Sequence, residues 1–390
     1  MNEDLWYNMR VLFLSQGRDI EDHPGWHDAL VRLKAEGEIE DFKNIPYFGY
    51  AEKHGWQSFY NDVVEIANFE RFDLIYFHYF HSKGKPSPEN CINSLSKLKP
   101  KPIIITSCGD PFSDNWMRPD FPEDFKEVSR LADITFSTQM GKAADRMIRW
   151  GAKNVVLSPN SMCQVRFQAH KIDLEKHRFD FDVVFVGSNN SNRLFNPVSK
   201  AWFAAKERNA LVKALTQRYG KRFGLFGNSW KYSTSQGPVK FNEQQNAFQR
   251  GRVIVGGNPY SHSDYYSSNR VFFEISSGVP TVELFVPRLD KIFRDNEHVY
   301  FANDISSLLK KIDQLLDRDP ISLYKTAGRA AEFVEKKHTQ YHRMLFKLNT
   351  VKEFIQNGYR LNVIFPFFLD EVDQADEKKY ALRIKGLLCV

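Results

Sequence analysis

Short apolar strand candidates alternate with amphipathic helix candidates along almost the whole chain. An order of strand, helix and strand is typical of βαβ units, which place parallel strands in one sheet and cover both faces with helices. A chain of 390 residues is too long for one ordinary core, and its strands fall into two sets. The pattern therefore predicts an α/β protein of two domains, each built on a parallel sheet.

Ten segments are predicted as strands. They are Arg10–Ser15, Phe72–Phe80, Pro102–Ser107, Ala132–Ser137 and Asn154–Ser158 in the first half, and Phe181–Val186, Phe223–Phe226, Arg252–Val255, Thr281–Leu284 and His298–Phe301 in the second. Helices are expected between them at about 26–36, 56–68, 122–131, 142–150, 200–219, 242–248, 269–276, 287–294 and 306–316. Two further helices are expected at 323–337 and 341–356.

The domain boundary is expected in the polar stretch Ser161–Arg178, where apolar periodicity lapses. We therefore predict an N-terminal domain over residues 1–165 and a C-terminal domain over 175–340. Residues 341–390 are predicted to form a helix and tail that pack back on the N-terminal domain. For the apolar stretch Leu361–Val372, contact with a partner or with a membrane surface is the alternative.

Composition narrows the class of protein. With 42% hydrophobic and 26% charged residues, the chain has the make-up of a folded globular protein. Its four cysteines lack metal-ligand spacing, and no uninterrupted apolar run reaches the ~18 residues of a membrane span, so we expect a cytoplasmic protein without a transmembrane segment. A net charge of +6 favours anionic ligands such as nucleotide diphosphates, nucleic acid or membrane surfaces; plain solubility is the alternative.

The most informative segment is Ser263–Leu284, SDYYSSNRVFFEISSGVPTVEL. A serine-rich loop enters an amphipathic helix, which Gly278 ends before the next strand. The N-terminus of a helix offers free backbone N–H groups and a positive dipole end to phosphate. The candidate phosphate ligands are Ser267, Ser268, Asn269 and Arg270.

Glu274 follows Arg270 by four residues, so both lie on one face of the expected helix. A carboxylate at this place can accept hydrogen bonds from the hydroxyls of a ribose or a sugar. The structural alternative is a weak ion pair on the helix surface.

The run Arg270-Val-Phe-Phe-Glu274, followed by Gly278-Val-Pro280, resembles the donor-binding helix of group 1 glycosyltransferases, and it is most similar to the CgeB-like, or spore-maturation, subgroup. The segments FDVVFVGS, FGLFGNSW and RVIVGGNPY precede it in the order that this resemblance requires. The resemblance covers about residues 180–316. It implies the GT-B fold, which consists of two Rossmann-like domains. The C-terminal domain would bind a nucleotide-sugar donor, and the N-terminal domain would shape the acceptor site.

The resemblance also implies roles for the residues of this helix. Glu274 would hold hydroxyls of the donor, and Arg270 with the amides of 267–269 would face the diphosphate. Retaining enzymes of the group commonly carry a second glutamate eight residues earlier, where this chain has Tyr266. Whether the configuration of the sugar is inverted or retained therefore stays open.

Two other loops supply further donor-site candidates. Val184–Arg193, VFVGSNNSNR, contains Gly187, Ser188 and Arg193, and the loop after the next strand contains Asn228. Glycine permits a close approach of the backbone to a ligand, and open α/β sheets bind ligands at the carboxyl ends of their strands. The alternative is an ordinary turn between a strand and a helix.

Three residues of the first half are candidates for the base that deprotonates an acceptor hydroxyl. Asp110 follows the strand 102–107, His78 lies near the end of the strand 72–80, and His23 lies in the loop after the first strand. The alternatives are a turn-capping role for Asp110 and structural roles for the histidines. The sequence does not rank the three.

Phosphate-transferring P-loops, nucleophile elbows and dinucleotide fingerprints are absent from the sequence. We therefore predict a glycosyltransferase that moves a sugar from a nucleoside-diphosphate sugar, UDP-sugar foremost, to a hydroxyl of a glycan or another acceptor, without cofactor or metal. One alternative is a non-catalytic nucleotide- or sugar-binding protein of the same fold. Another is a glycosyltransferase that acts on DNA.

Overall fold

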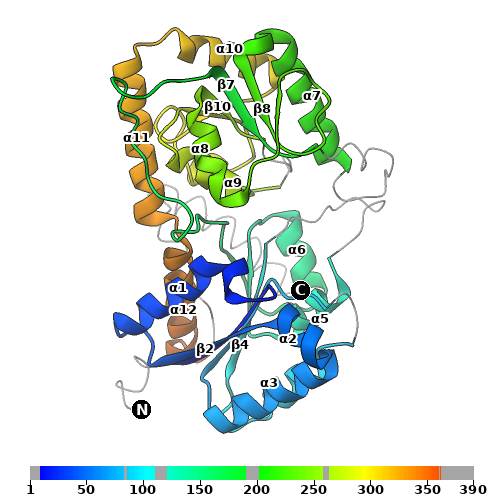
Figure 1. Cartoon of the computed structure of the whole chain (residues 1–390). Coiled ribbons are helices and arrows are strands. Elements are labelled where there is room, and N and C mark those ends of the chain that lie inside the picture. The colour runs from blue at the N-terminus through cyan, green and yellow to red at the C-terminus, as the bar shows by residue number, and fades with distance from the viewer. Residues whose placement is uncertain are drawn as a thin grey trace. The chain divides into compact units, whose positions relative to one another are not determined.

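The computed structural model describes residues 9–82, 86–109, 121–189, 202–257, 263–359 and 361. These residues divide into two compact units, shown in Figure 1. Described residues up to Pro159 and from Gln340 onward belong to unit 1, and Asn160–Thr339 form unit 2. The borders expected from the sequence were 165, 175 and 340.

Unit 1 is built on a six-stranded parallel sheet of order β2-β1-β3-β4-β5-β6. Its strands are β1 (Arg10–Ser15), β2 (Asp41–Pro46), β3 (Leu74–His78), β4 (Ile103–Cys108), β5 (Ile134–Ser137) and β6 (Val155–Leu157). Its helices are α1 (Pro24–Ala35), α2 (Tyr47–His54), α3 (Trp56–Glu70), α4 (Glu89–Leu95), α5 (Glu123–Leu131), α6 (Lys142–Arg149) and α12 (Gln340–Gln356).

Strand β1 shows how this sheet buries both of its faces. Val11 and Phe13 point into a core shared with α1 and α12, whereas Leu12 and Leu14 point into a second core shared with α3 and α4. This follows from the alternation of side chains along a strand. Helix α12, the last helix that the structure describes, lies beside α1 (Figure 1).

Unit 2 contains a second six-stranded parallel sheet, of order β12-β11-β10-β7-β8-β9. Its strands are β7 (Phe181–Val186), β8 (Phe223–Phe226), β9 (Ser235–Gly237), β10 (Gly251–Val255), β11 (Thr281–Leu284) and β12 (Tyr300–Ala302). Its helices are α7 (Trp202–Tyr219), α8 (Gln244–Gln249), α9 (Asn269–Ser276), α10 (Ile305–Leu316) and α11 (Pro320–Lys337). Helices α7 and α10 share one apolar core with the strands, while α8 contacts β7, β10 and α9.

The sequence pattern did not predict the strands β2 and β9 or the helices α2 and α4. Strand β2, DFKNIP, is an edge strand whose side chains are mostly half-buried, so it lacks the apolar run of a central strand. The helix expected at 287–294 was wrong, because only the 3₁₀ turn Leu289–Lys291 forms there.

Candidate donor-binding site

Two glycine turns meet at the carboxyl ends of β7 and β8 in unit 2. The N–H of Gly187 donates to the carbonyl of Phe226 at 2.8 Å, and the N–H of Asn189 donates to the carbonyl of Asn228 at 2.8 Å. The indole Nε1 of Trp230 donates to the carbonyl of Gly187 at 2.6 Å. The predicted donor residues Gly187, Ser188 and Asn228 are therefore held together by backbone hydrogen bonds.

Gly227 allows this close packing. Its φ of +137° is rarely adopted by residues with a side chain, and a β-carbon added to it would lie 2.3 Å from the carbonyl oxygen of Gly187. The turn that carries Gly187 and Ser188 is thus fixed from behind by a position that requires glycine.

Arg270, in the first turn of α9, brings its guanidinium to the same turn. Its Nη1 would lie 2.9 Å from a β-carbon added at Gly187. This nitrogen is buried and has no hydrogen-bond partner among the residues that the structure describes. A buried guanidinium donor left unpaired is costly, so an acceptor from a ligand is the natural partner.

Arg208, on α7, is a second guanidinium at this turn. It is almost fully buried, and it donates from Nη1 to the carbonyl of Ser188 at 3.3 Å and from Nη2 to the carbonyl of Gly257 at 3.4 Å. Sequence reasoning missed it, because it lies in a stretch rich in lysine and arginine that fits a solvated helix face equally well. Its spacing from Leu211 and Leu215, on the apolar face of α7, was the available signal.

The serine loop before α9 is well positioned around the helix N-terminus. Ser267 is fully buried, its carbonyl accepts from Nδ2 of Asn160 at 2.9 Å, and its hydroxyl has no partner within the described part of the chain. Ser268 is the N-cap residue but makes no side-chain cap hydrogen bond, and Asn269 is exposed. The loop therefore leaves hydrogen-bonding groups available at the positive end of α9.

Glu274 is buried, with 1% of its surface exposed, and its carboxyl group lies next to that of Glu283 on β11. Glu283 fills the space that Gly256 leaves empty, since its Oε1 would lie 1.6 Å from a β-carbon at Gly256. Burial raises the pKa of Glu274, and the positive charges of Arg270 and Arg208 oppose that rise. Two carboxyl groups in such contact share a proton.

This carboxyl pair was not predicted. In the sequence, Glu283 is an ordinary member of the predicted strand TVEL. Its position within an apolar strand was the only indication that its carboxyl group is buried. In this structure Glu274 points to Glu283, so its expected contact with hydroxyls of the donor stays a prediction. The charges of Arg270 and Arg208 both act on this pair.

Replacing Glu274 with glutamine is expected to raise the melting temperature near neutral pH. Because the folded-state pKa of Glu274 lies above its unfolded value, its contribution to stability is fully present below the ordinary carboxyl pKa and is lost as pH rises through the raised value. Glutamine has no such loss, so the gain over the parent should be larger at about pH 8 than at about pH 5. Thermal melts across this range measure the difference. The exposed Glu52, paired with Arg18 at 2.9 Å, provides the control substitution Glu52→Gln, and equal gains at both pH values would contradict the prediction.

The base candidates lie in unit 1, and the structure describes two of the three. His78 ends β3 and is fully buried, and burial, followed by the charges of His23 and Lys347, lowers its pKa well below the usual range. His23 is the half-buried N-cap residue of α1, with its ring 6.1 Å from that of His78. Asp110, and the donor candidate Arg193 of unit 2, lie outside the described residues.

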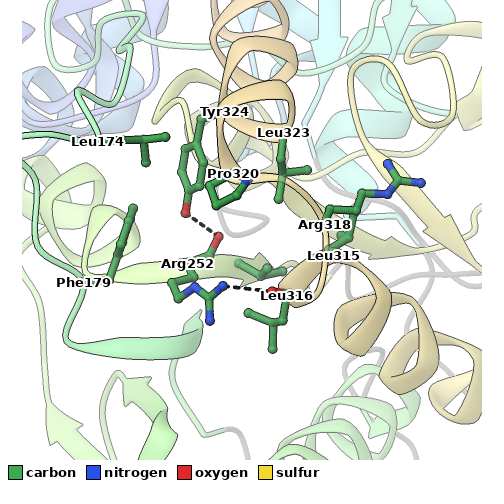
Figure 2. A pocket seen from close by; sticks show the side chains of 10 residues that line it. Leu174, Phe179, Arg252, Leu315, Leu316, Arg318, Pro320, Leu323 and Tyr324 are labelled. Carbon is green, nitrogen blue, oxygen red and sulfur yellow. Dashed lines mark hydrogen bonds between the residues drawn. The ribbon is translucent and has the colours of Figure 1, made fainter.

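A cavity of about 320 Å³ lies at the opposite end of the unit 2 strands from the glycine turns, near the start of β10 (Figure 2). Its walls are mainly apolar, and Figure 2 shows two hydrogen bonds there: the Tyr324 hydroxyl donates to the carbonyl of Arg252 at 2.8 Å, and the Arg252 guanidinium donates to the carbonyl of Leu316 at 2.9 Å. The guanidinium of Arg318, the other basic group of the lining, lies 5.7 Å from the ring centre of Tyr300. A diphosphate would find few free donors there. The glycine turns at the carboxyl ends of the strands are the better candidate for the donor site.

Residues 206–349 match the sequence model of a family described as "Glycosyl transferase-like". The match covers less than half of the chain and contains Arg208, Arg270, Glu274 and Glu283. No curated protein sequence matches the chain.

Solved structures match over nearly the whole chain. One is an alpha-glucosyltransferase in complex with UDP and a 13-mer DNA (TM-score 0.59, 12% identity, 88% of this chain and 99% of that chain). Another is a sucrose-phosphate synthase from Thermosynechococcus elongatus (0.56, 12%, 90% and 100%). A third is HepE from Anabaena in complex with UDP and glucose (0.53, 11%, 91% and 100%).

The chain has the GT-B glycosyltransferase fold. Its two parallel sheets with covering helices are those of the GT-B fold that the resemblance implied. The predicted class of enzyme, a glycosyltransferase, is confirmed at this level by the family match. The CgeB-like subgroup, the donor, the acceptor and the site residues stay predictions.

None of the helices that the structure describes is both long enough and apolar enough to cross a membrane. Within the described residues, no group of three or more histidine, cysteine, aspartate or glutamate side chains is placed to hold a metal ion. The cytoplasmic location and the metal-independent reaction stay predictions.

Proposed function

We propose that unit 2 binds a UDP-sugar and that the chain transfers its sugar to an acceptor hydroxyl, in the manner of the CgeB-like glycosyltransferases. In this proposal the diphosphate lies against the turn Gly187–Ser188, with Arg270 and Arg208 on its flanks and the N-terminus of α9 beside it. Ser267, Ser268 and Asn269 supply further donors to the phosphates or the sugar.

The buried Nη1 of Arg270 is the observation that carries the proposal. It occupies the space that the missing side chain of Gly187 leaves, 2.9 Å from where a β-carbon would lie, and it has no acceptor among the described residues. Arg208 reaches the same turn from another helix. Two guanidiniums and a helix N-terminus that converge on one glycine turn favour a ligand with more than one negative charge.

The reaction that fits this site needs stabilisation of a leaving group. The bond between the anomeric carbon of the sugar and the diphosphate oxygen breaks, a bond to the acceptor oxygen forms, and the acceptor proton passes to a base. Arg270, Arg208 and the dipole of α9 would neutralise the charge that develops on the departing UDP, without a metal. His23, His78 and Asp110 remain the candidates for the base, and we propose to test His23 and Asp110 first because His78 is fully buried.

UDP is the nucleotide to test first, because two of the similar structures contain it. Thermal melts of the full chain with UDP, GDP and ADP should show a rise in melting temperature for UDP that grows with its concentration, since a ligand at about 100 times its Kd stabilises by about 2.7 kcal/mol. Release of UDP from UDP-sugars, with and without mixed hydroxyl acceptors, then measures turnover.

The same measurements separate the alternatives. UDP binding without hydrolysis or transfer would favour a non-catalytic binding protein, and no response to any nucleotide would contradict the proposal. Duplex DNA as the acceptor is a further arm. Retention on DNA that weakens steeply with salt, together with sugar transfer to it, would identify a DNA acceptor.

A further inference from the structure

Four basic side chains gather at the carboxyl end of the unit 1 sheet, and we call them the basic cluster: His23, His78, Arg343 and Lys347. His78 ends β3, and His23 is the N-cap residue of α1. Arg343 and Lys347 lie one turn apart on α12, with 0% and 2% of their surfaces exposed. None of the donor-site residues of unit 2 belongs to this cluster.

The imidazole of His78 is enclosed by aromatic side chains. Its ring stacks on Tyr79 at 4.0 Å between centroids and lies 4.9 Å from the ring of Trp26. Both ring nitrogens are buried, and neither has a hydrogen-bond partner among the residues that the structure describes. An imidazole always carries at least one N–H donor, so burial without an acceptor is costly.

Lys347 is buried among aromatic rings. Its Nζ lies 4.6 Å from the ring centre of Trp26, 5.6 Å from that of Tyr76 and 5.7 Å from that of Phe136. No carboxylate in the described ranges forms an ion pair with it, and burial followed by the charge of Arg343 lowers its pKa well below the usual range. A buried ammonium without a counter-ion costs several kcal/mol or more, which an anion would offset.

The charges around the basic cluster also favour the binding of an anion. Burial lowers the pKa of Arg343 to about 9, and its Nε donates to the carbonyl of Pro159 at 2.9 Å. The positive end of the α1 helix dipole lies at His23. The nearest acids along the chain, Asp19, Glu21 and Asp22, lie in the turn before α1, where the Asp22 carboxylate is exposed and accepts the N–H of Arg18 at 2.6 Å.

We propose that the basic cluster is an oxyanion site, which binds the carboxylate or phosphate group of an acidic sugar or glycan acceptor. The half-buried His23 and Tyr79 form its accessible side, and His78, Lys347 and Arg343 lie behind them. The site lies where open α/β sheets bind ligands, at the carboxyl ends of the strands. As an acceptor site the proposal rests on the proposed function, whereas the binding of an oxyanion does not.

The test uses calorimetric titration of the full chain carrying Arg270→Ala, which removes the guanidinium that would attract a phosphate to unit 2. The probes are glucose 6-phosphate, glucuronate and neutral glucose. We expect the two anions to bind and glucose to bind much more weakly. Of the two, the anion that binds more tightly identifies the acidic group, phosphate or carboxylate.

Two variants locate the binding. Lys347→Met should weaken the binding of the better anion by about tenfold or more, and His23→Ala by about three- to tenfold. Lys352→Met is the matched control, because Lys352 lies on the same helix but pairs with Glu38 at 2.8 Å, and it should leave the affinity unchanged. Replacing a buried unpaired cation by an apolar side chain of similar length should keep or raise the melting temperature; if Lys347→Met does not fold, His23→Ala still decides.

Equal anion affinities with and without Lys347→Met or His23→Ala, each in the chain that carries Arg270→Ala, would overturn the proposal. A failure of both anions to bind would overturn it too. Titration of UDP into the parent chain is read separately. Anion binding without UDP binding would leave the oxyanion site standing and reject the proposed donor, and UDP binding without anion binding would do the reverse.

Discussion

Replacement of Arg270 by alanine is expected to weaken UDP binding by about 30- to 100-fold. The Arg270 guanidinium has a buried Nη1 beside Gly187 without an acceptor in the described part of the chain, so its hydrogen bond to a phosphate would be charge-assisted and desolvated. Such bonds contribute about 2–3 kcal/mol. Calorimetric titration of UDP into the parent and the variant measures the difference, and the rate of UDP release from a UDP-sugar should fall by at least as much.

Arg218→Ala is the matched control for this prediction. Arg218 belongs to the same unit, but its guanidinium is exposed and pairs with Asp313 at 2.6 Å. Its loss should change the affinity for UDP less than about twofold, because exposed ion pairs contribute little. Arg270→Lys keeps the charge but not the fork of donors, and it should fall between the parent and alanine. Equal affinities of Arg270→Ala and Arg218→Ala would place the nucleotide elsewhere.

Gly227→Ala is expected to lower the stability of unit 2 by about 2–4 kcal/mol, which for a unit of this size is a drop in melting temperature of about 5–15 °C. The backbone at φ +137° strains any side chain, and the new β-carbon would lie 2.3 Å from the carbonyl oxygen of Gly187. Relief of that collision has to move the turn that carries Ser188. We therefore expect a loss of UDP affinity together with the loss of stability.

Gly237→Ala separates the collision from the backbone strain. Gly237 also has a positive φ, +85°, but a β-carbon there would meet no atom within 4 Å. This control should lose about 1 kcal/mol and keep its affinity for UDP. Thermal melts and UDP titrations of both variants provide the comparison. Similar losses in the two would show that the packing of the Gly227 turn against Gly187 does not shape the site.

The fold was largely predictable, because the strands of a parallel sheet are covered on both faces. RVLFLS and FDVVFV are buried on both sides, so they read as continuous apolar runs. The strands that were missed lie at the edges of the sheets, where side chains are less completely buried. DFKNIP is an edge strand of the unit 1 sheet with mostly half-buried side chains, and SQG is a three-residue edge strand of the unit 2 sheet.

The site was predictable only where a local pattern reflects a local cause. Arg270 and the serine loop were found because a loop that enters a helix is visible in one stretch of sequence. Arg208 and Glu283 come to the site from a different helix and a different strand, so no spacing along the chain connects them to it. For the same reason, Lys347 and Arg343 could not be linked to His78, which precedes them by more than 260 residues.

Helix α12 belongs to unit 1 although the residues that lead into it belong to unit 2. Its side chains Met344, Phe346, Leu348 and Val351 complete the core that α1 and the sheet begin. During synthesis, the continuous segment 160–339 can therefore reach its final fold before the earlier unit does. The unit that contains the first half of the chain is complete only after α12 has been synthesised, which reverses the usual order in which the N-terminal domain folds first.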